Sequence, residues 1–231
     1  MVPRIGRLLA LGALAGALGC QSLGRVAARK EPTQAVSDLI PPTAKSSAFL
    51  TEKHFVTSWL VLGPFQFGES DFGGDQQQPA ADKEFVANEG ALDGTQSPPK
   101  GAAWQAKDFK GDFQAGKIDL DGLYNKPDHA AAYAVSWLHC PEAVRDATLL
   151  VGSDDYIKVW LNGALVHAYK EKRRASEWDQ DKAKVSLLKG DNRVVVKCVD
   201  VVFDWDFYLR FADKDGRPIA VTARKPAAPG K

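Results

Sequence analysis

The chain has 231 residues, of which 45% are hydrophobic, 10% aromatic and 26% charged. This composition is typical of a globular domain and excludes collagenous, disordered and multi-span membrane proteins. With 30 Lys plus Arg against 29 Asp plus Glu, the formal net charge is +1. A nucleic-acid-binding protein is therefore not expected, because phosphate contacts require a clustered excess of Lys and Arg.

The N-terminus has the features of an export signal. Arg4 and Arg7 precede an uncharged stretch, residues 8–19, that is rich in Leu, Ala and Gly and too short to cross a bilayer as a helix. The end of this stretch, Ala17-Leu18-Gly19-Cys20, resembles a bacterial lipoprotein lipobox. The resemblance implies cleavage before Cys20, acylation of Cys20 and anchoring of an exported protein to a membrane of the bacterial cell envelope. The alternative is plain secretion by cleavage nearby, with Cys20 incidental.

The composition then divides the chain into a tether, one domain and a tail. Residues 20–50 contain Pro, Ala, Ser, Lys and Gln without sustained periodicity, which indicates a flexible tether. Residues 224–231 form a polar tail interrupted by Pro. We therefore expect a single folded domain over residues 51–223.

This domain shows many short β-type runs bounded by Gly, Pro, Asn and Asp, and no long helical periodicity. Such spacing is typical of an antiparallel β-sandwich. The expected strands are Ser58–Leu62, Ala131–Leu138, Ala147–Val151, Tyr156–Leu161, Leu165–Tyr169, Lys184–Leu188, Arg193–Val199 and Trp205–Ala212. Gly63-Pro64 is expected to end the first strand, and Asn162-Gly163 to form a type I′ hairpin turn, since both positions of that turn need positive φ. Residues 73–101 form a long polar excursion that is either functional or mobile.

The second half of the chain resembles a known group of sandwiches. The runs that carry the resemblance are Gly152-Ser153-Asp154-Asp155-Tyr156-Ile157-Lys158-Val159-Trp160-Leu161-Asn162-Gly163, Asp179-Gln180-Asp181-Lys182, Lys189-Gly190-Asp191-Asn192 and Trp205-Asp206-Phe207-Tyr208-Leu209-Arg210. They are similar to the galactose-binding-like jelly roll, and the Asp-Asp hairpin also resembles the PA14 sandwich. The resemblance implies an all-β jelly roll over about residues 55–220 with a binding role. It specifies the fold well and the function weakly, so each site needs its own argument.

Two of the expected strands present mixed aromatic and charged faces, because alternate side chains of a strand share one face. These faces contain Tyr156, Lys158 and Trp160 on one strand and Tyr208 and Arg210 on the other. Aromatic rings can stack on the C–H faces of sugars while charged groups bond to their hydroxyls, so these residues are candidates for a carbohydrate platform. In the alternative, the N-terminal segment or the long excursion covers this face, Trp160 is buried and the charges are paired. Trp205 is assigned to the core.

Asp154-Asp155 is a candidate calcium site. Adjacent carboxylates at a strand end can present several oxygens to a hard cation such as Ca²⁺. In some PA14-type adhesins a neighbouring Asp pair holds a calcium ion that ligates sugar hydroxyls, so the resemblance implies the same role here. The alternative is that the pair closes a turn by accepting hydrogen bonds from nearby backbone N–H groups. Asp179 and Asp181 either complete such a site or stay solvated.

Four common enzyme motifs are absent from the sequence, whereas paired carboxylates suited to glycoside hydrolysis are defined by their separation in space. The sequence contains no Gly-x-Ser-x-Gly elbow, P-loop, dinucleotide-binding glycine motif or His-Glu-x-x-His. His139 and Cys140 are adjacent on a strand and point to opposite faces, so they cannot both join Cys198 in a zinc site. Cys140 and Cys198 either form a disulfide, which export permits, or are small buried hydrophobic residues.

The sequence therefore predicts a non-catalytic, lipid-anchored β-sandwich that requires no cofactor, with a calcium ion at Asp154 and Asp155 as the alternative to a turn-closing role for this pair. The expected ligand of the protein is a glycan or another polyol-rich polymer of the envelope. The alternative is a structural or protein-interaction lipoprotein of the cell envelope that uses the same sandwich as an adaptor and binds no sugar. Joint exposure of Trp160 and Tyr208 would favour the first function.

Overall fold

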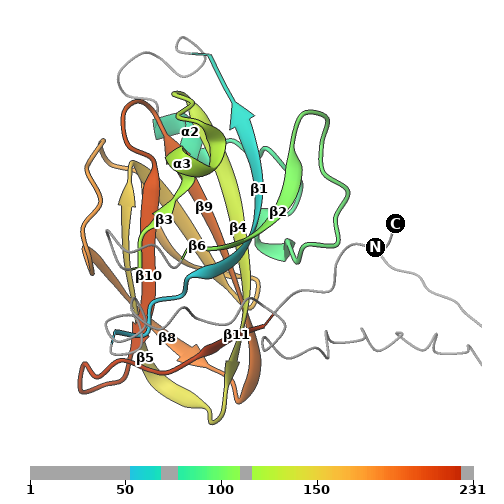
Figure 1. Cartoon of the computed structure of the whole chain (residues 1–231). Helices are drawn as coiled ribbons and strands as arrows, with labels where there is room; N and C mark the ends of the chain where they lie inside the picture. Colours follow the sequence, from blue (N-terminus) through green and yellow to red (C-terminus); the bar gives the residue numbers. More distant parts are fainter. Residues whose placement is uncertain (1–52, 69–77, 110–115, 225–231) are drawn as a thin grey trace, which may run out of the picture. The chain divides into compact units, whose positions relative to one another are not determined.

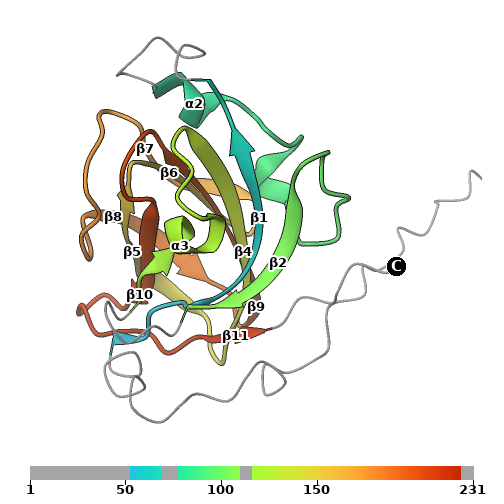
Figure 2. The same cartoon turned by 45° about the horizontal axis from the view of Figure 1, so that its top comes forward.

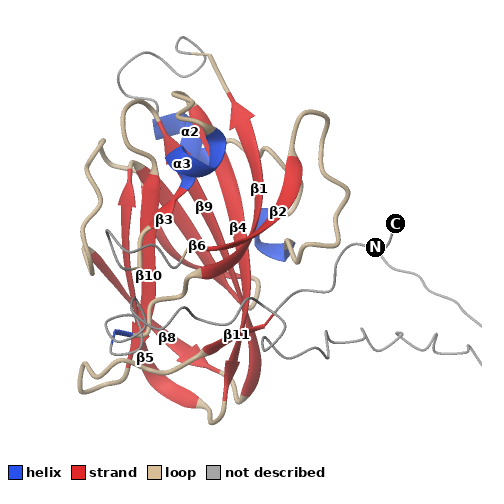
Figure 3. Cartoon of the chain, viewed as in Figure 1, coloured by secondary structure: helices blue, strands red, loops and turns tan. Residues whose placement is uncertain are grey.

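The computed structural model describes residues 53–68, 78–109 and 116–224. The predicted signal peptide, Cys20 and nearly all of the predicted tether and tail lie outside these residues. The described residues form two antiparallel sheets with few and short helices (Figures 1 and 3). The predicted all-β sandwich is thus confirmed. No helix within the described ranges is long and apolar enough to cross a membrane.

The larger sheet has the strand order β2-β1-β4-β9-β6-β7, and β11 pairs with the C-terminal part of β4. All of its pairs for which a register is given are antiparallel. Its strands are β1 (Ser58–Gln66), β2 (Ala103–Asp108), β4 (Ala130–Cys140), β6 (Tyr156–Leu161), β7 (Ala164–Tyr169), β9 (Gly190–Asp200) and β11 (Thr222–Arg224).

The smaller sheet has the order β3-β10-β5-β8. Its strands are β3 (Ile118–Asp119), β5 (Val144–Asp154), β8 (Asp181–Leu187) and β10 (Asp206–Ala212). In Figure 2, β5, β8 and β10 lie on one side of the domain and β1, β2 and β4 on the other. The helical segments are α2 (Gln78–Asp82), the single 3₁₀ turn η3 (Glu89–Ala91) and α3 (Leu120–Tyr124).

The core lies between the sheets and follows the expected alternation. Ile157 and Val159 of β6 and Phe207 and Leu209 of β10 belong to one buried cluster, together with Trp205, which is fully buried as predicted. Each such side chain contributes about 1.5–3 kcal/mol when it is removed from water. Because alternate side chains of these strands point into the core, only the intervening side chains can contribute to a site on the outer face of each sheet.

The outer face of the larger sheet is also covered. Residues 78–95 lie on it, and they build two further buried clusters around Tyr156 and Trp160 of β6. Lys197 of β9 holds this segment in place: its side chain is fully buried, and Nζ donates to the carbonyls of Ala81 and Lys83 and to Glu89 Oε1 at 2.9 Å. The described part of the long excursion is therefore a packed second layer of the domain.

The strand predictions are confirmed in place, and their ends are corrected. β6 has the predicted bounds, and the turn that follows has the expected positive φ at Asn162 and Gly163, 52° and 90°. The predicted end of the first strand at Gly63-Pro64 is wrong, because β1 continues to Gln66 after a register shift between Leu62 and Phe65. Strands β2, β3 and β11 have no counterpart among the predicted strands.

Cys140 and Cys198 are both free and buried, so the disulfide alternative is wrong. The reason is their register. Cys140 pairs with Gly190 at one end of β9, whereas Cys198 lies near the other end and pairs with Ala132. At a rise of about 3.3 Å per residue, eight residues along β4 separate the two positions by far more than a disulfide can span.

Candidate functional site

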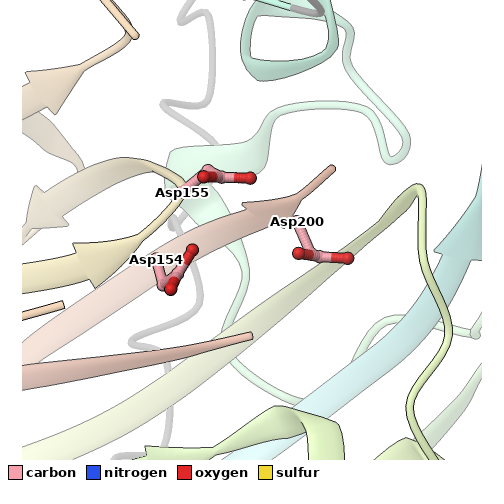
Figure 4. A group of neighbouring side chains, drawn as sticks. All are labelled: Asp154, Asp155 and Asp200. Atoms are coloured by element: carbon pink, nitrogen blue, oxygen red, sulfur yellow. The ribbon is translucent and has the colours of Figure 1, made fainter. Parts of the chain in front are cut away.

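Three aspartates meet at one end of the sandwich because two strands end there. β5 ends at Asp154, Asp155 forms the connection to β6, and β9 ends at Asp200. The pairing of Tyr156 with Val199, and a 3.1 Å hydrogen bond from the Asp155 N–H to the Val199 carbonyl, bring the Asp pair beside Asp200. Figure 4 shows the three side chains grouped around the end of β9.

The spacing of these carboxylates suits a cation. Each of the three residues offers one carboxylate oxygen, and these oxygens lie within 4.8 Å of one another. Calcium binds oxygen at 2.3–2.6 Å, so ligands on opposite sides of the ion are about 5 Å apart. All three residues are buried, with 8%, 1% and 0% of Asp154, Asp155 and Asp200 exposed. The donors are hard oxygens, which fit Ca²⁺ better than a soft transition metal.

Asp200 carries the least compensated charge. Within the described part of the chain neither of its carboxylate oxygens, both buried, has a hydrogen-bond partner. Burial, with the neighbouring charge of Asp155, raises the pKa of Asp200 to about 9. Burial and the same neighbour raise the pKa of Asp154 to about 8. Because isolated buried carboxylates are costly, this end of the domain requires either bound protons or a bound cation.

Asp155 differs from Asp200, since several groups of the protein contact its carboxylate. Its Oδ1 accepts a hydrogen bond from the Arg174 N–H at 3.2 Å and its Oδ2 accepts one from the Val201 N–H at 3.0 Å. The Arg173 Nε lies 3.5 Å from Oδ2. Asp155 thus joins two connections through its backbone N–H partners, as the turn-forming alternative expects, and its side chain also hydrogen-bonds to that of Asp154. The peptide bond between Asp154 and Asp155 is cis.

A fourth acid lies close to the group. Asp121 of α3 is buried, and its Oδ1 has no hydrogen-bond partner within the described ranges. Its charge is among those that raise the pKa of Asp200, and burial raises the pKa of Asp121 itself. Asp119 caps the start of α3 by accepting a 2.8 Å hydrogen bond from the Gly122 N–H, which fixes the short helix that carries Asp121.

The candidate carbohydrate residues do not form one platform. Tyr156, Lys158 and Trp160 lie on β6 of the larger sheet, whereas Tyr208 and Arg210 lie on β10 of the smaller sheet. Since each set faces outward from its own sheet, they are on opposite sides of the sandwich. This corrects the predicted joint surface, because the order of the strands in the sheets could not be derived from the sequence pattern.

Both sets of residues match the alternative prediction, in which the aromatic side chains are buried and the charged side chains are paired. Tyr156, Trp160 and Tyr208 are buried, and Lys158 Nζ lies 2.8 Å from an Asp82 carboxylate oxygen. Arg210 donates to Asp179 at 2.9 Å.

Asp179 and Asp181 do not join the three aspartates. Asp179 is occupied by Arg210, and Asp181 is 2.5 Å from Arg174 and 3.1 Å from His167. Burial of the carboxyl is outweighed by Arg174, so the pKa of Asp181 is lowered. Both acids therefore serve as ion-pair partners, and neither predicted role applies.

Asp200 and Asp121 are the members of the group that sequence reasoning missed. The signal for Asp200 was available: it directly follows the predicted strand Arg193–Val199, which would place it at a strand end like Asp154. Only the pairing of β6 with β9, which joins segments far apart in sequence, brings the two ends together. Asp121 gave no such signal.

No family model matches the chain, and no curated protein matches it. Among solved structures, the chain is similar to the PA14 sugar-binding domain from an RTX adhesin, with 13% identity, a TM-score of 0.43 and coverage of 76% of this chain and 100% of that one. It is also similar to the PA14 domain of the MpAFP antifreeze protein, with 11% identity, a TM-score of 0.37 and 77% of each chain covered. A β-glucuronidase from Faecalibacterium prausnitzii matches at 13% identity and a TM-score of 0.35 over 70% of this chain and 22% of the enzyme.

Proposed function

We propose that this protein is a non-catalytic module that binds glycans through a calcium ion held by Asp154, Asp155 and Asp200. The observation that carries the proposal is the Asp200 carboxylate, fully buried and without a partner in the described part of the chain, beside an adjacent pair of carboxylates. A cation would remove the cost of burying these charges, and its preferred ligands are the oxygens that the three residues supply.

When bound, the ion would supply positions at which sugar hydroxyls bind. The chain's own residues prepare the site. Asp155 fixes the connection after β9 through the Val201 N–H and the connection before β8 through the Arg174 N–H. The carboxylates of Asp154 and Asp200 repel each other when both are ionised. Because these contacts hold the two residues close before the ion binds, the entropic cost of ordering the site is lower.

We further propose that the domain is exported and held at a membrane of the cell envelope by lipid on Cys20. The basic residues, short apolar stretch and lipobox-like end of the N-terminus support this. An anchored module of this kind would meet a glycan or another envelope polymer, and its near-neutral composition suits recognition by a few placed groups. Adaptor function without sugar binding is the competing outcome of the test.

A glycan array tests the proposal. The full chain is applied with Ca²⁺ and, separately, with chelator, next to D200N and the matched variant D146N, which changes an exposed aspartate on β5. We expect glycan binding by the wild type and D146N only with Ca²⁺, and none by D200N. Absence of saccharide binding by the folded wild type under both conditions would overturn the proposal and favour the adaptor.

A further inference from the structure

A cavity of about 300 Å³ lies at the other end of the larger sheet, between η3 and the turn from β6 to β7. Trp160, Gly163, Glu89 and Arg193 are among the residues that line it. Arg193 is near the start of β9 and Asp200 is its last residue, so the cavity is about 23 Å from the three aspartates at roughly 3.3 Å per residue. It is a separate site.

Two polar atoms of buried side chains remain available at this cavity. Glu89 is 5% exposed, and its Oε1 accepts hydrogen bonds from Lys197 and from the Tyr133 hydroxyl. Both of these hydrogen bonds go to Oε1, and among the described residues neither Glu89 Oε2 nor Nε1 of Trp160, which is 8% exposed, makes a hydrogen bond. The cavity therefore offers one strong acceptor and one donor whose hydrogen bonds a ligand could complete.

The walls of the cavity are fixed before any ligand arrives. Arg193 donates to the carbonyls of Gly90 at 3.1 Å and Ala91 at 3.3 Å, which ties η3 to the sheet. The indole of Trp160 packs so closely on Gly90 that a Cβ there would lie 2.6 Å from Trp160 Cδ1. The buried Lys197 holds Glu89 from the other side. A preformed site avoids the cost of ordering loops on binding.

We propose that this cavity binds a small uncharged polyol of monosaccharide size, without a metal ion. A volume of about 300 Å³ is at the lower end of small-molecule sites. Hydroxyl groups both accept and donate, so one can accept from the Trp160 N–H and a neighbouring one can donate to Glu89 Oε2. Lys197 compensates the charge of Glu89, and the other two charged lining residues, Glu84 and Arg193, have opposite formal charges, so no net charge selects an ion. This second site is independent of the calcium ion of the proposed function.

Indole resonances of the ¹⁵N-labelled full chain test the inference in the presence of chelator. The probes are the methyl pyranosides of glucose, galactose and mannose. W160F identifies the Trp160 indole resonance by its loss, and W178F, which changes an exposed tryptophan on the other side of the sandwich, is the matched control. We expect at least one probe to shift the Trp160 indole resonance saturably in the wild type, in W178F and in D200N.

Loss of one hydrogen bond in W160F is expected to weaken binding of that probe about three- to tenfold, measured on the methyl glycoside resonances. Thermal unfolding of W160F checks that it is folded. The inference is overturned if no probe shifts the Trp160 indole resonance, or if a shift occurs only with Ca²⁺. Because D200N removes only the proposed calcium site, the binding of a methyl glycoside at the cavity can be measured and interpreted even if the proposed function is wrong.

Discussion

Two residues of β9, Lys197 and Asp200, are both fully buried and charged in type, yet their surroundings differ completely. Lys197 has three acceptors, and burial lowers its pKa while Glu89 opposes the shift. Asp200 has no partner in the described part of the chain, and its pKa is raised to about 9 by burial and by Asp155. The charge of Lys197 is thus compensated by other groups of the protein. The charge of Asp200 would need a bound proton or cation for its compensation.

The difference separates a structural charge from a functional one. A buried ion pair with additional hydrogen bonds holds a segment in one place, here residues 78–95 on the larger sheet. A buried carboxylate without compensation lowers stability, so its presence calls for a proton or a ligand. The clustering of Asp154 and Asp155 around Asp200 favours a ligand that several carboxylates share.

Removal of the structural charge has the largest expected effect. K197M deletes the cation that Glu89 and two carbonyls face, and it leaves buried acceptors without a donor. We expect the free energy of unfolding to fall by about 3–5 kcal/mol in urea titrations. K182M, at an exposed lysine of β8, should change it by less than about 0.5 kcal/mol. A loss for K197M as small as that for K182M would mean that Lys197 does not hold the covering segment.

Calcium is expected to have the next largest effect. At a free concentration 100 times the dissociation constant, the ion should stabilise the wild type by about 2.7 kcal/mol, because it binds the folded state alone. D200N should gain little from Ca²⁺. Thermal unfolding with Ca²⁺ and with chelator measures both, and an equal gain in D200N would place the ion elsewhere.

The raised pKa values of Asp154 and Asp200 also predict a pH dependence in the chelated protein. The pKa values of Asp154 and Asp200 are raised to about 8 and about 9, above their unfolded values, so the folded state holds more protons between about pH 4 and pH 8–9. Stability should therefore fall as pH rises through this window, by up to about 1.4 kcal/mol per pH unit for each group.

D200N should reduce the slope of this dependence, since its amide does not titrate. Urea titrations at a series of pH values in chelator give the slopes. Parallel lines for the wild type and D200N would show that Asp200 ionises freely without a cation.

The smallest effect is expected on the outer face of the smaller sheet. D179N removes the partly exposed partner of Arg210 and should cost about 0.2–1 kcal/mol. Glycan binding should be unchanged, because Tyr208 is buried and Arg210 pairs with Leu150, four residues along β5 from Asp154. A loss of glycan binding in D179N would return Tyr208 and Arg210 to the ligand site.

Local sequence patterns were sufficient for eight of the eleven strands in the described residues and insufficient for the sites. β6 and its Asn162-Gly163 turn depend on neighbouring residues only, and their bounds were predicted. Which face of β6 meets solvent depends on residues 78–95, whose packing through Glu89 and Lys197 joins segments far apart in sequence. The same alternation that identified Trp160 and Tyr208 as facing away from the core could not show that they belong to different sheets.

The Asp pair was recognised for the same local reason, since two acids follow a strand directly. Its third partner required the register of β6 against β9. That Asp200 lacks a hydrogen-bond donor could not be predicted from the sequence, because it depends on the positions of all the elements packed around it.

Calcium stoichiometry tests the central claim most directly. The full-length wild type, D200N and D146N are freed of metal with chelator, dialysed against Ca²⁺ and titrated calorimetrically. We expect one high-affinity calcium ion per chain in the wild type and D146N, and none in D200N. No calcium binding by the wild type, or equal binding by D200N, would contradict the assignment of the buried aspartates as a cation site.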